Sequence, residues 1–399
     1  MVKTTTQVAR KHATRIPHET KAKPTAGSGT PGPSLQQQRQ TSAVDVSSSK
    51  PVPQGTLPEV RGLILKYKPN RGSEVSRPAE RVLKTVASID ALLSKSSDPK
   101  VLAKLMVDED LRTPLFRLEG LLRLYEPKFG HRFEKRLEKV KGLEDQLGAV
   151  GFAKDALAQA EKAKLPAVTL DYLREKVGEQ QKVLEELVEK KWLPDPDKRG
   201  QVEEIDQLVG TLMDAEFGTH AQDQKYLRKE LASRMQDVAD TKYDFTELQS
   251  GVHELRRNLR WLPIYMHSLD GAIQLSEEKN SVPALKKLLA TPEAQSKFLV
   301  SGPIDREPSQ IVLSKSLMVA HCNQIAALGT FKDNGEYFHE LSEALVESKA
   351  VKSHEKAEAM VAAALGKTET STFLESARDS YAGFVKSGAL PALVAELEG

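Results

Sequence analysis

The chain has 399 residues and a formal net charge of +2, so electrostatic binding has to come from local clusters of charge rather than from the molecule as a whole. Its single cysteine, Cys322, excludes an intrachain disulfide and a thiolate metal cage. Aromatic residues make up only 5% of the chain, and Ala, Leu, Glu and Lys abound, which is typical of helical proteins. No run approaches the roughly 20 apolar residues of a membrane-spanning helix, so we expect no membrane span.

Residues 1–57 form the first predicted region. They are rich in Thr, Ser, Pro, Gly and Gln, and they begin with a basic stretch. A segment of this composition cannot bury enough apolar surface to offset its chain entropy. We therefore expect a disordered basic tail.

The remainder of the chain predicts helices joined by short loops. Ser76 is a suitable N-cap for the first of them, and Pro78 fits its first turn. No convincing alternating strand appears. The periodicity of apolar residues predicts helices over 76–95, 98–109, 108–130, 131–164, 169–192, 202–217, 222–243, 250–269, 282–299 and 308–350, followed by two C-terminal helices. This pattern indicates an all-α fold built from antiparallel bundles.

The stretch "SGVHELRRNLRWLPIYMHSL" (250–269) carries an unusual density of basic residues at the start of a helix. His253, Arg256, Arg257 and Arg260 stand at positions i, i+3, i+4 and i+7, which share one helical face. Like charges on adjacent turns destabilise a helix by roughly 0.2–0.5 kcal/mol per pair. A polyanion bound across this face would recover that cost. A solvated basic face is the competing interpretation.

The predicted helix after Gly130 also carries a basic stripe, formed by Lys128, Arg132, Lys135, Arg136 and Lys139. Here we favour a solvated face or pairing with acidic residues. The segments "LEELVEK" (184–190) and "VEEIDQL" (202–208) could supply such partners.

An internal duplication is indicated by two similar pairs of segments. "DLRTPLFRLEGLLRLY" and "VHELRRNLRWLPIYMHSL" are Arg-bearing amphipathic helices. Each is followed by a Leu-Gly element with Phe, Lys and Asp, in 143–160 and in 322–341. The shared order predicts two bundles related by duplication, over 75–220 and 221–350, with a C-terminal helical extension over 351–399.

The doubled pattern of an Arg helix followed by Leu-Gly and Asp, with His-x-x-Arg-x-x-x-Arg at His253, Arg256 and Arg260, resembles the CHAD family, the conserved histidine α-helical domain. The resemblance implies paired bundles whose basic groove binds inorganic polyphosphate without catalysis. It also implies a cytoplasmic location, with association with polyphosphate granules as an option. Arg112, Arg117 and Arg123 fall on basic positions of the first motif, where Glu109 replaces the histidine. Together with the two basic stripes, the predicted polyphosphate-binding residues are His253, Arg256, Arg257, Arg260, Arg112, Arg117, Arg123, Arg132, Arg136 and Lys139.

Motifs of catalysis are missing from the sequence. There is no GxxxxGK[ST] phosphate loop, dinucleotide fingerprint, HExxH or nucleophile elbow. His321 and Cys322 are adjacent and point in different directions on a helix, so they make a poor metal pair, and His321 is interpreted as an interior residue. We expect no enzyme activity, cofactor or metal. The alternative function is a helical scaffold for protein partners that has lost its anion site, and nucleic acid is a second, less favoured ligand because few aromatics flank the basic faces.

Overall fold

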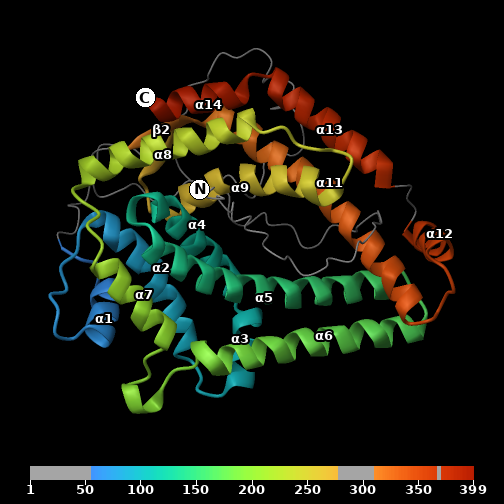
Figure 1. Ribbon diagram of the computed structural model, residues 1–399, viewed down its shortest axis with the longest axis horizontal. Coiled ribbons are helices and arrows are strands. Elements are labelled where there is room, and N and C mark those ends of the chain that lie inside the picture. The colour runs from blue at the N-terminus through green and yellow to red at the C-terminus, as the bar shows by residue number, and fades with distance from the viewer. Residues whose placement is uncertain (1–54, 277–309, 366–369) are drawn as a thin grey trace, which may run out of the picture.

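The computed structural model describes residues 55–276, 310–365 and 370–399, and it confirms the all-α class (Figure 1). The helices of the first half are α1 (Pro58–Tyr67), α2 (Arg77–Leu93), α3 (Pro99–Asp108), α4 (Arg112–Phe129), α5 (His131–Lys162), α6 (Ala167–Leu187) and α7 (Glu203–Met213). The second half contains α8 (His220–Asp240), α9 (Glu254–Ser268), α11 (Lys315–Glu347), α12 (His354–Leu365), α13 (Thr370–Lys386) and α14 (Ala389–Glu398). The predicted tail falls almost wholly outside these residues, as does the helix expected over 282–299.

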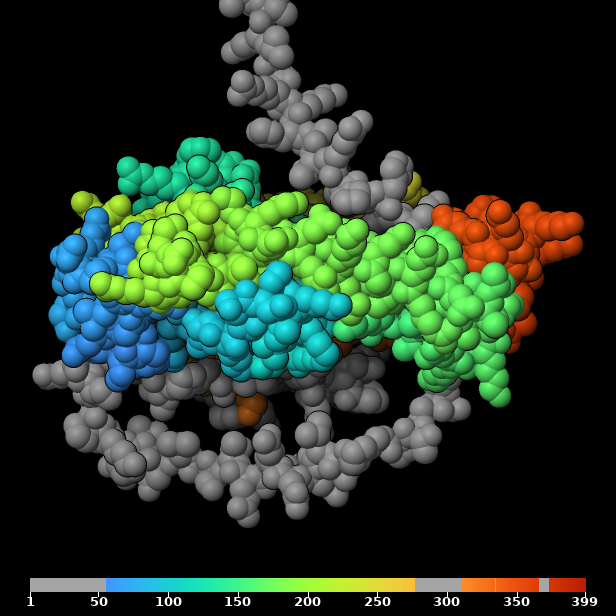
Figure 2. All heavy atoms as spheres, turned by 90° about the horizontal axis from the view of Figure 1, so that it is seen from below, coloured from blue at the N-terminus to red at the C-terminus, as the bar shows by residue number. Residues whose placement is uncertain are grey.

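The helices are arranged in antiparallel pairs (Figure 1). The long helices α5 and α6 form a hairpin along one edge, and α14 packs against α8 along the opposite edge. Between them, α11 runs from α13 and α14 to the far end of the α5–α6 hairpin, where α12 covers it. From below, α3 and α6 cover the middle of the molecule, with α1 and α12 at opposite ends (Figure 2).

One main hydrophobic core joins most of these helices. It extends from Val60 in α1 to Leu397 in α14 and is rich in fully buried leucines. A smaller core forms where the ends of α5 and α6 meet α11 and α12, around Phe338 and Leu341. The domain boundaries expected near residues 220 and 350 stay predictions.

Two short parallel strands differ from the expectation that the chain contains no strand. β1 (Ile273–Ser276) follows α9, and β2 (Ile311–Ser314) precedes α11, with Ile273 opposite Ile311. Each strand has only four residues, which is too short for an alternating pattern to be recognised in a helical context. The helix expected over 308–350 therefore begins later, at Lys315.

Helices α4 and α9 cross closely at Gly120. A Cβ atom at Gly120 would lie 3.0 Å from Ile264 and 3.5 Å from Trp261, so any larger residue would require the Ile264 side chain to shift. Alignment of Arg112 with Arg256 makes Ile264 the counterpart of Gly120, which means that equivalent positions of the two Arg helices meet at the crossing.

Other contacts at this crossing are also reciprocal. The guanidinium of Arg123 lies 5.2 Å from the Trp261 ring. In the same alignment the counterpart of Arg123 is His267 and the counterpart of Trp261 is Arg117. Burial and then the nearby charge of Arg117 lower the pKa of His267. Such exchange of contacts is what a local two-fold relation between duplicated helices requires.

Proline residues inside α4 and α9 are accommodated by side chains of neighbouring helices. Pro127 lies inside α4, which continues to Phe129. A helical proline leaves the carbonyl four residues earlier without its usual donor. Arg234 donates to the carbonyl of Arg123 at 2.7 Å. In the same way His321 Nε2 lies 2.8 Å from the carbonyl oxygen of Leu259, four residues before Pro263.

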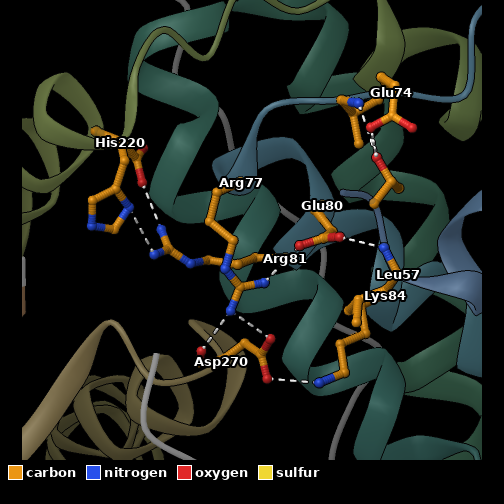
Figure 3. A network of polar contacts seen from close by, with 11 residues as sticks. Leu57, Glu74, Arg77, Glu80, Arg81, Lys84, His220 and Asp270 are labelled. Atoms are coloured by element: carbon orange, nitrogen blue, oxygen red, sulfur yellow. Dashed lines mark hydrogen bonds and ion pairs between the residues drawn. The ribbon is translucent and has the colours of Figure 1, made fainter. Parts of the chain in front are cut away.

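A buried ion pair fixes α2 against α8. Arg81 donates to Asp223 at 2.9 Å with both side chains fully buried, and Tyr125 of α4 donates to the same carboxylate at 2.8 Å. Beside it, Arg77 bonds Asp270 in the turn after α9 (Figure 3). The network thus connects α2 with α4, α8 and the end of α9, so the helices that carry the predicted basic motifs are anchored to one another.

Substitution of Gly120 by leucine tests the close crossing. We expect Gly120→Leu to lower the free energy of unfolding by about 1–3 kcal/mol, because the side chain has to displace Ile264 and Trp261. Gly142→Ala in α5 is the control, since a Cβ there meets nothing within 4 Å. It should stabilise the protein by about 0.5–1 kcal/mol through helix propensity. Urea denaturation measures the free energy of unfolding of both variants. Equal changes in the two variants would contradict the close approach of α4 and α9 at Gly120.

Acid pH should destabilise the protein through His321. Burial lowers the pKa of His321 to about 4 from 6.5, so between these values the unfolded chain binds a proton that the folded chain does not. The free energy of unfolding should therefore fall by about 3 kcal/mol as the pH drops from about 6.5 to 4. His321→Gln keeps an amide donor for the Leu259 carbonyl, and its denaturation profile should lose this part of the pH dependence. If the His321→Gln variant kept the full pH dependence of the free energy of unfolding, His321 would not be its source.

Candidate functional site

Three predicted arginines come together between α4 and α9. Arg112 is the first residue of α4, while Arg256 and Arg260 lie one turn apart on α9. The guanidinium carbons of Arg112 and Arg260 lie 5.0 and 4.4 Å from the centre of the Phe116 ring. Phe116 and Arg260 are counterparts in the alignment of the two Arg helices. Their contact therefore joins equivalent positions of α4 and α9, as the contact of Gly120 with Ile264 does. We call Arg112, Arg256 and Arg260 the arginine cluster.

The two Leu-Gly elements found in the sequence make room for this cluster. A Cβ atom at Gly148 in α5 would lie 2.7 Å from Arg112 Nη2. A Cβ atom at Gly329 in α11 would lie 3.0 Å from Arg256 Nε. Each arginine thus packs against the glycine of its own repeat, which explains why the Arg helix and the Leu-Gly element occur together twice.

The positive charge of the arginine cluster is only partly compensated. Arg112 pairs with the buried carboxylate of Glu144 at 2.7 Å. Among the residues that the structure describes, neither Arg256 nor Arg260 has a carboxylate within ion-pair distance, and Arg256 Nε is buried without a hydrogen-bond partner. Burial, followed by repulsion from Arg256 and Arg112, lowers the pKa of Arg260 to about 10. An anion placed here would relieve this repulsion.

His253 lies beside the cluster but faces an acidic group. Its Nδ1 lies 3.5 Å from Glu336 Oε1 on α11, and Lys332 contacts the other oxygen of that carboxylate. Burial acts to raise the pKa of Glu336, but His253 and Lys332 outweigh it and lower the pKa. His253 is therefore half-buried against a carboxylate of α11 at the N-terminus of α9.

The duplicated aspartates also lie at this end of α5 and α11. Asp155 hydrogen-bonds Tyr337, whose ring stacks on Phe152 with 5.8 Å between centroids. Burial and the charge of Asp333 raise the pKa of Asp155. This arrangement joins the two helices.

Three further predicted residues lie along the α4–α9 crossing, outside the arginine cluster. Arg257 is exposed and pairs with Glu254 at 2.7 Å, one turn earlier in α9. Arg123 pairs with Glu119 at 2.8 Å. Arg117 is exposed near His267. The face expected to hold His253, Arg256, Arg257 and Arg260 together is therefore divided, with Arg257 on a different side of α9.

The predicted residues of α5 are not brought to the cluster. Arg136 is buried, with Glu204 at 3.1 Å and Gln207 at 2.6 Å, and Glu204 belongs to the acidic segment "VEEIDQL". It lies about 18 Å along α5 from Gly148, at about 1.5 Å per residue. Arg132 and Lys139 are exposed on the same part of α5. For Arg136, the geometry is that of the interpretation favoured for this stripe, a pair with an acidic residue.

Within residues 55–276, 310–365 and 370–399, no group of three or more His, Cys, Asp or Glu side chains is placed to hold a metal ion. His321 and Cys322 are both buried, and His321 is occupied with the Leu259 carbonyl. Among the helices described, none combines the length and apolar character required to cross a membrane.

Comparisons of the chain with models of protein families, with curated proteins and with solved structures find no match. The function is therefore argued from the arginine cluster and its surroundings. Sequence reasoning missed Glu144 as the partner of Arg112 and the role of Gly148 and Gly329 in holding the arginines. The repeated Leu-Gly pair was the available signal for the glycines, whereas nothing in the local sequence marks Glu144.

Substitution by an uncharged residue should have opposite effects on stability at Arg112, which pairs with a carboxylate, and at Arg260, which does not. Arg260→Met should raise the free energy of unfolding by about 1 kcal/mol, because it removes a repelled, largely buried charge and keeps a contact with Phe116. Arg112→Met should lower it by about 1–3 kcal/mol, because Glu144 loses its partner. Urea denaturation of both variants is the measurement. Equal losses in the two variants would contradict the charge balance described.

Proposed function

We propose that the chain binds a linear polyanion, inorganic polyphosphate in the first place, at the arginine cluster formed by Arg112, Arg256 and Arg260. The observation that carries this proposal is the lack of any carboxylate within ion-pair distance of Arg256 or Arg260 in the described part of the chain. A folded protein retains repelling, partly buried guanidinium groups at a cost in stability. A ligand that neutralises them accounts for that cost.

Arginine suits this ligand because its planar fork donates two parallel hydrogen bonds to phosphate oxygens. The partial burial of Arg256 and Arg260 strengthens each bond relative to bulk water. Bound phosphate would also remove the mutual repulsion and return the pKa of Arg260 toward its ordinary value. Binding would release counterions from the polyanion, so affinity should fall with salt.

The proposed site is smaller than the set of residues predicted from the sequence. His253 is taken up by Glu336 and Arg136 by Glu204, so we assign neither to direct phosphate contact. Three arginines would contact a short stretch of the polyanion. Polyphosphate is preferred over single-stranded nucleic acid because Phe116, the aromatic ring in the cluster, already lies against two guanidinium groups and offers no free face for a base.

Titration with polyphosphate tests this function. Wild-type protein should bind it at low salt, with a slope of log affinity against log salt of about −2 to −3, as expected for three charge contacts. The double variant Arg256→Gln, Arg260→Gln should bind at least about tenfold more weakly, since hydrogen bonds to charged groups contribute about 1.5–3 kcal/mol each.

The matched control is Arg132→Gln with Lys139→Gln, which removes the same charge from exposed positions of α5. It should change the affinity by less than about threefold. Equal weakening in both double variants would reduce the binding to non-specific attraction. An absence of binding by folded wild-type protein at low salt would overturn the proposal.

A helical scaffold that has lost its anion site is the second candidate function. It is favoured by the carboxylate contacts of His253 and Arg136 inside the chain, which occupy two of the predicted binding residues. In that case wild-type protein and the double variant would behave alike in the titration. Stronger binding of a single-stranded oligonucleotide than of polyphosphate would instead assign nucleic acid as the ligand.

A further inference from the structure

A pocket of about 220 Å³ lies between α4, α8 and α9 and shares no residue with the arginine cluster. Its polar lining converges from all three helices, with one arginine from each. The residues that matter for its chemistry are Arg123, Arg234, Arg257, Asn258, Trp261 and Tyr265. Nothing in the proposed polyanion function uses this pocket.

The pocket arginines retain hydrogen-bond donors after their internal pairs are formed. Arg123 directs Nε and Nη2 to Glu119 of its own helix, at 2.9 and 2.8 Å. Arg234 uses Nη2 for the Arg123 carbonyl and for Glu230, while its buried Nε has no hydrogen-bond partner in the described structure. A guanidinium has five N–H donors, so these contacts within the protein hold the arginines in place and leave donors for a ligand.

Tyr265 supplies a second, independent indication of a ligand. Its side chain is 1% exposed and lines the pocket, yet its hydroxyl has no hydrogen-bond partner among the described residues. Buried hydroxyls are nearly always hydrogen-bonded, because an unsatisfied one costs about 1–3 kcal/mol. Burial raises the pKa of Tyr265 to about 12, while the charges of Arg234 and Arg123 act to lower it. The hydroxyl therefore stays protonated near neutral pH and can donate to an acceptor.

The remaining lining limits the size and charge of the ligand. Asp237 also lines the pocket, and Glu119, Glu230 and Glu254 pair with its arginines, so a polyanion would meet four carboxylates. A ligand with one oxyanion group meets less of this repulsion than a polyanion does and can accept hydrogen bonds from the spare donors. Apolar side chains form much of the remaining wall and suit an uncharged body. These are Leu231, Met235, Val238 and Leu262, beside the ring of Trp261.

We propose that this pocket binds a small organic oxyanion, a carboxylate or a phosphate monoester on a compact apolar body. The oxyanion accepts hydrogen bonds from Tyr265 and from the spare donors of Arg234 and Arg257. The apolar body lies against Trp261 and Met235. The Gly120 crossing positions the ring of Tyr265, since a Cβ at Gly120 would lie 3.4 Å from it.

Isothermal titration calorimetry with phenyl phosphate, benzoate and inorganic phosphate tests this site. At least one of the two aromatic ligands should saturate the protein with a Kd of about 1 mM or lower, a modest affinity suited to a small ligand. Inorganic phosphate should bind at least about tenfold more weakly, because it lacks the apolar body. Preference for phenyl phosphate would assign a phosphate ester, and preference for benzoate a carboxylic acid.

Variants locate the binding. Arg257→Gln changes an exposed side chain and should keep the fold, and it should weaken binding about tenfold. Tyr265→Phe removes only the hydroxyl and should do the same. Arg117→Gln is the charge-matched control, since Arg117 is exposed on α4 and does not line the pocket, and it should leave the affinity unchanged.

Three results would overturn the proposal: no saturable binding of either aromatic ligand at about 10 mM, equal weakening by Arg117→Gln and Arg257→Gln, or inorganic phosphate binding as tightly as the aromatic ligands. The outcome is independent of the polyphosphate titration, because Arg256 and Arg260 do not line this pocket. Either site can therefore fail without the other.

Discussion

The close approach of α4 and α9 at Gly120 is the constraint on which both candidate sites depend. Without a side chain at this position, the two Arg helices come near enough for Phe116 to contact Arg260 on one side and for Trp261 to contact Arg123 on the other. The crossing thus places Arg112, Arg256 and Arg260 in the arginine cluster on one side. On the other side, Arg123 and Arg257 line the pocket beside α8.

Internal prolines connect this crossing to its neighbours. Because Pro127 and Pro263 cannot donate, the carbonyls of Arg123 and Leu259 are open to side chains from other helices. Arg234 and His321 occupy these positions, so α8 is bonded to α4 and α11 is bonded to α9. A proline that would weaken an isolated helix here creates a specific contact between helices. For Arg234, the same contact also holds the guanidinium at the edge of the pocket.

The sequence predicted those features that depend on local pattern. Apolar periodicity located the helices, and the repeated Leu-Gly pair indicated the duplication that the contacts at Gly120, Gly148 and Gly329 reflect. Features that depend on distant partners could not be predicted. Helical spacing placed Arg257 with Arg256, but spacing alone does not show which side of α9 a neighbouring helix covers. For Arg136, the sequence indicated an acidic segment as a possible partner, but it could not show that Glu204 of that segment holds this arginine away from the cluster.

The treatment of buried arginines distinguishes the candidate polyanion site from an ordinary basic surface. Arg81 and Arg136 are buried, and each is paired with a buried carboxylate, which is the usual requirement for placing a charge in a protein interior. Arg256 and Arg260 depart from this pattern in the described structure, since they are partly buried, lie near Arg112 and pair with no carboxylate. A solvated face would leave such side chains free to extend into water. Packing against Gly329 and Phe116 instead restrains them. Restrained, repelling charges with no carboxylate partner among the described residues are the reason for proposing an anion from outside the chain as the ligand.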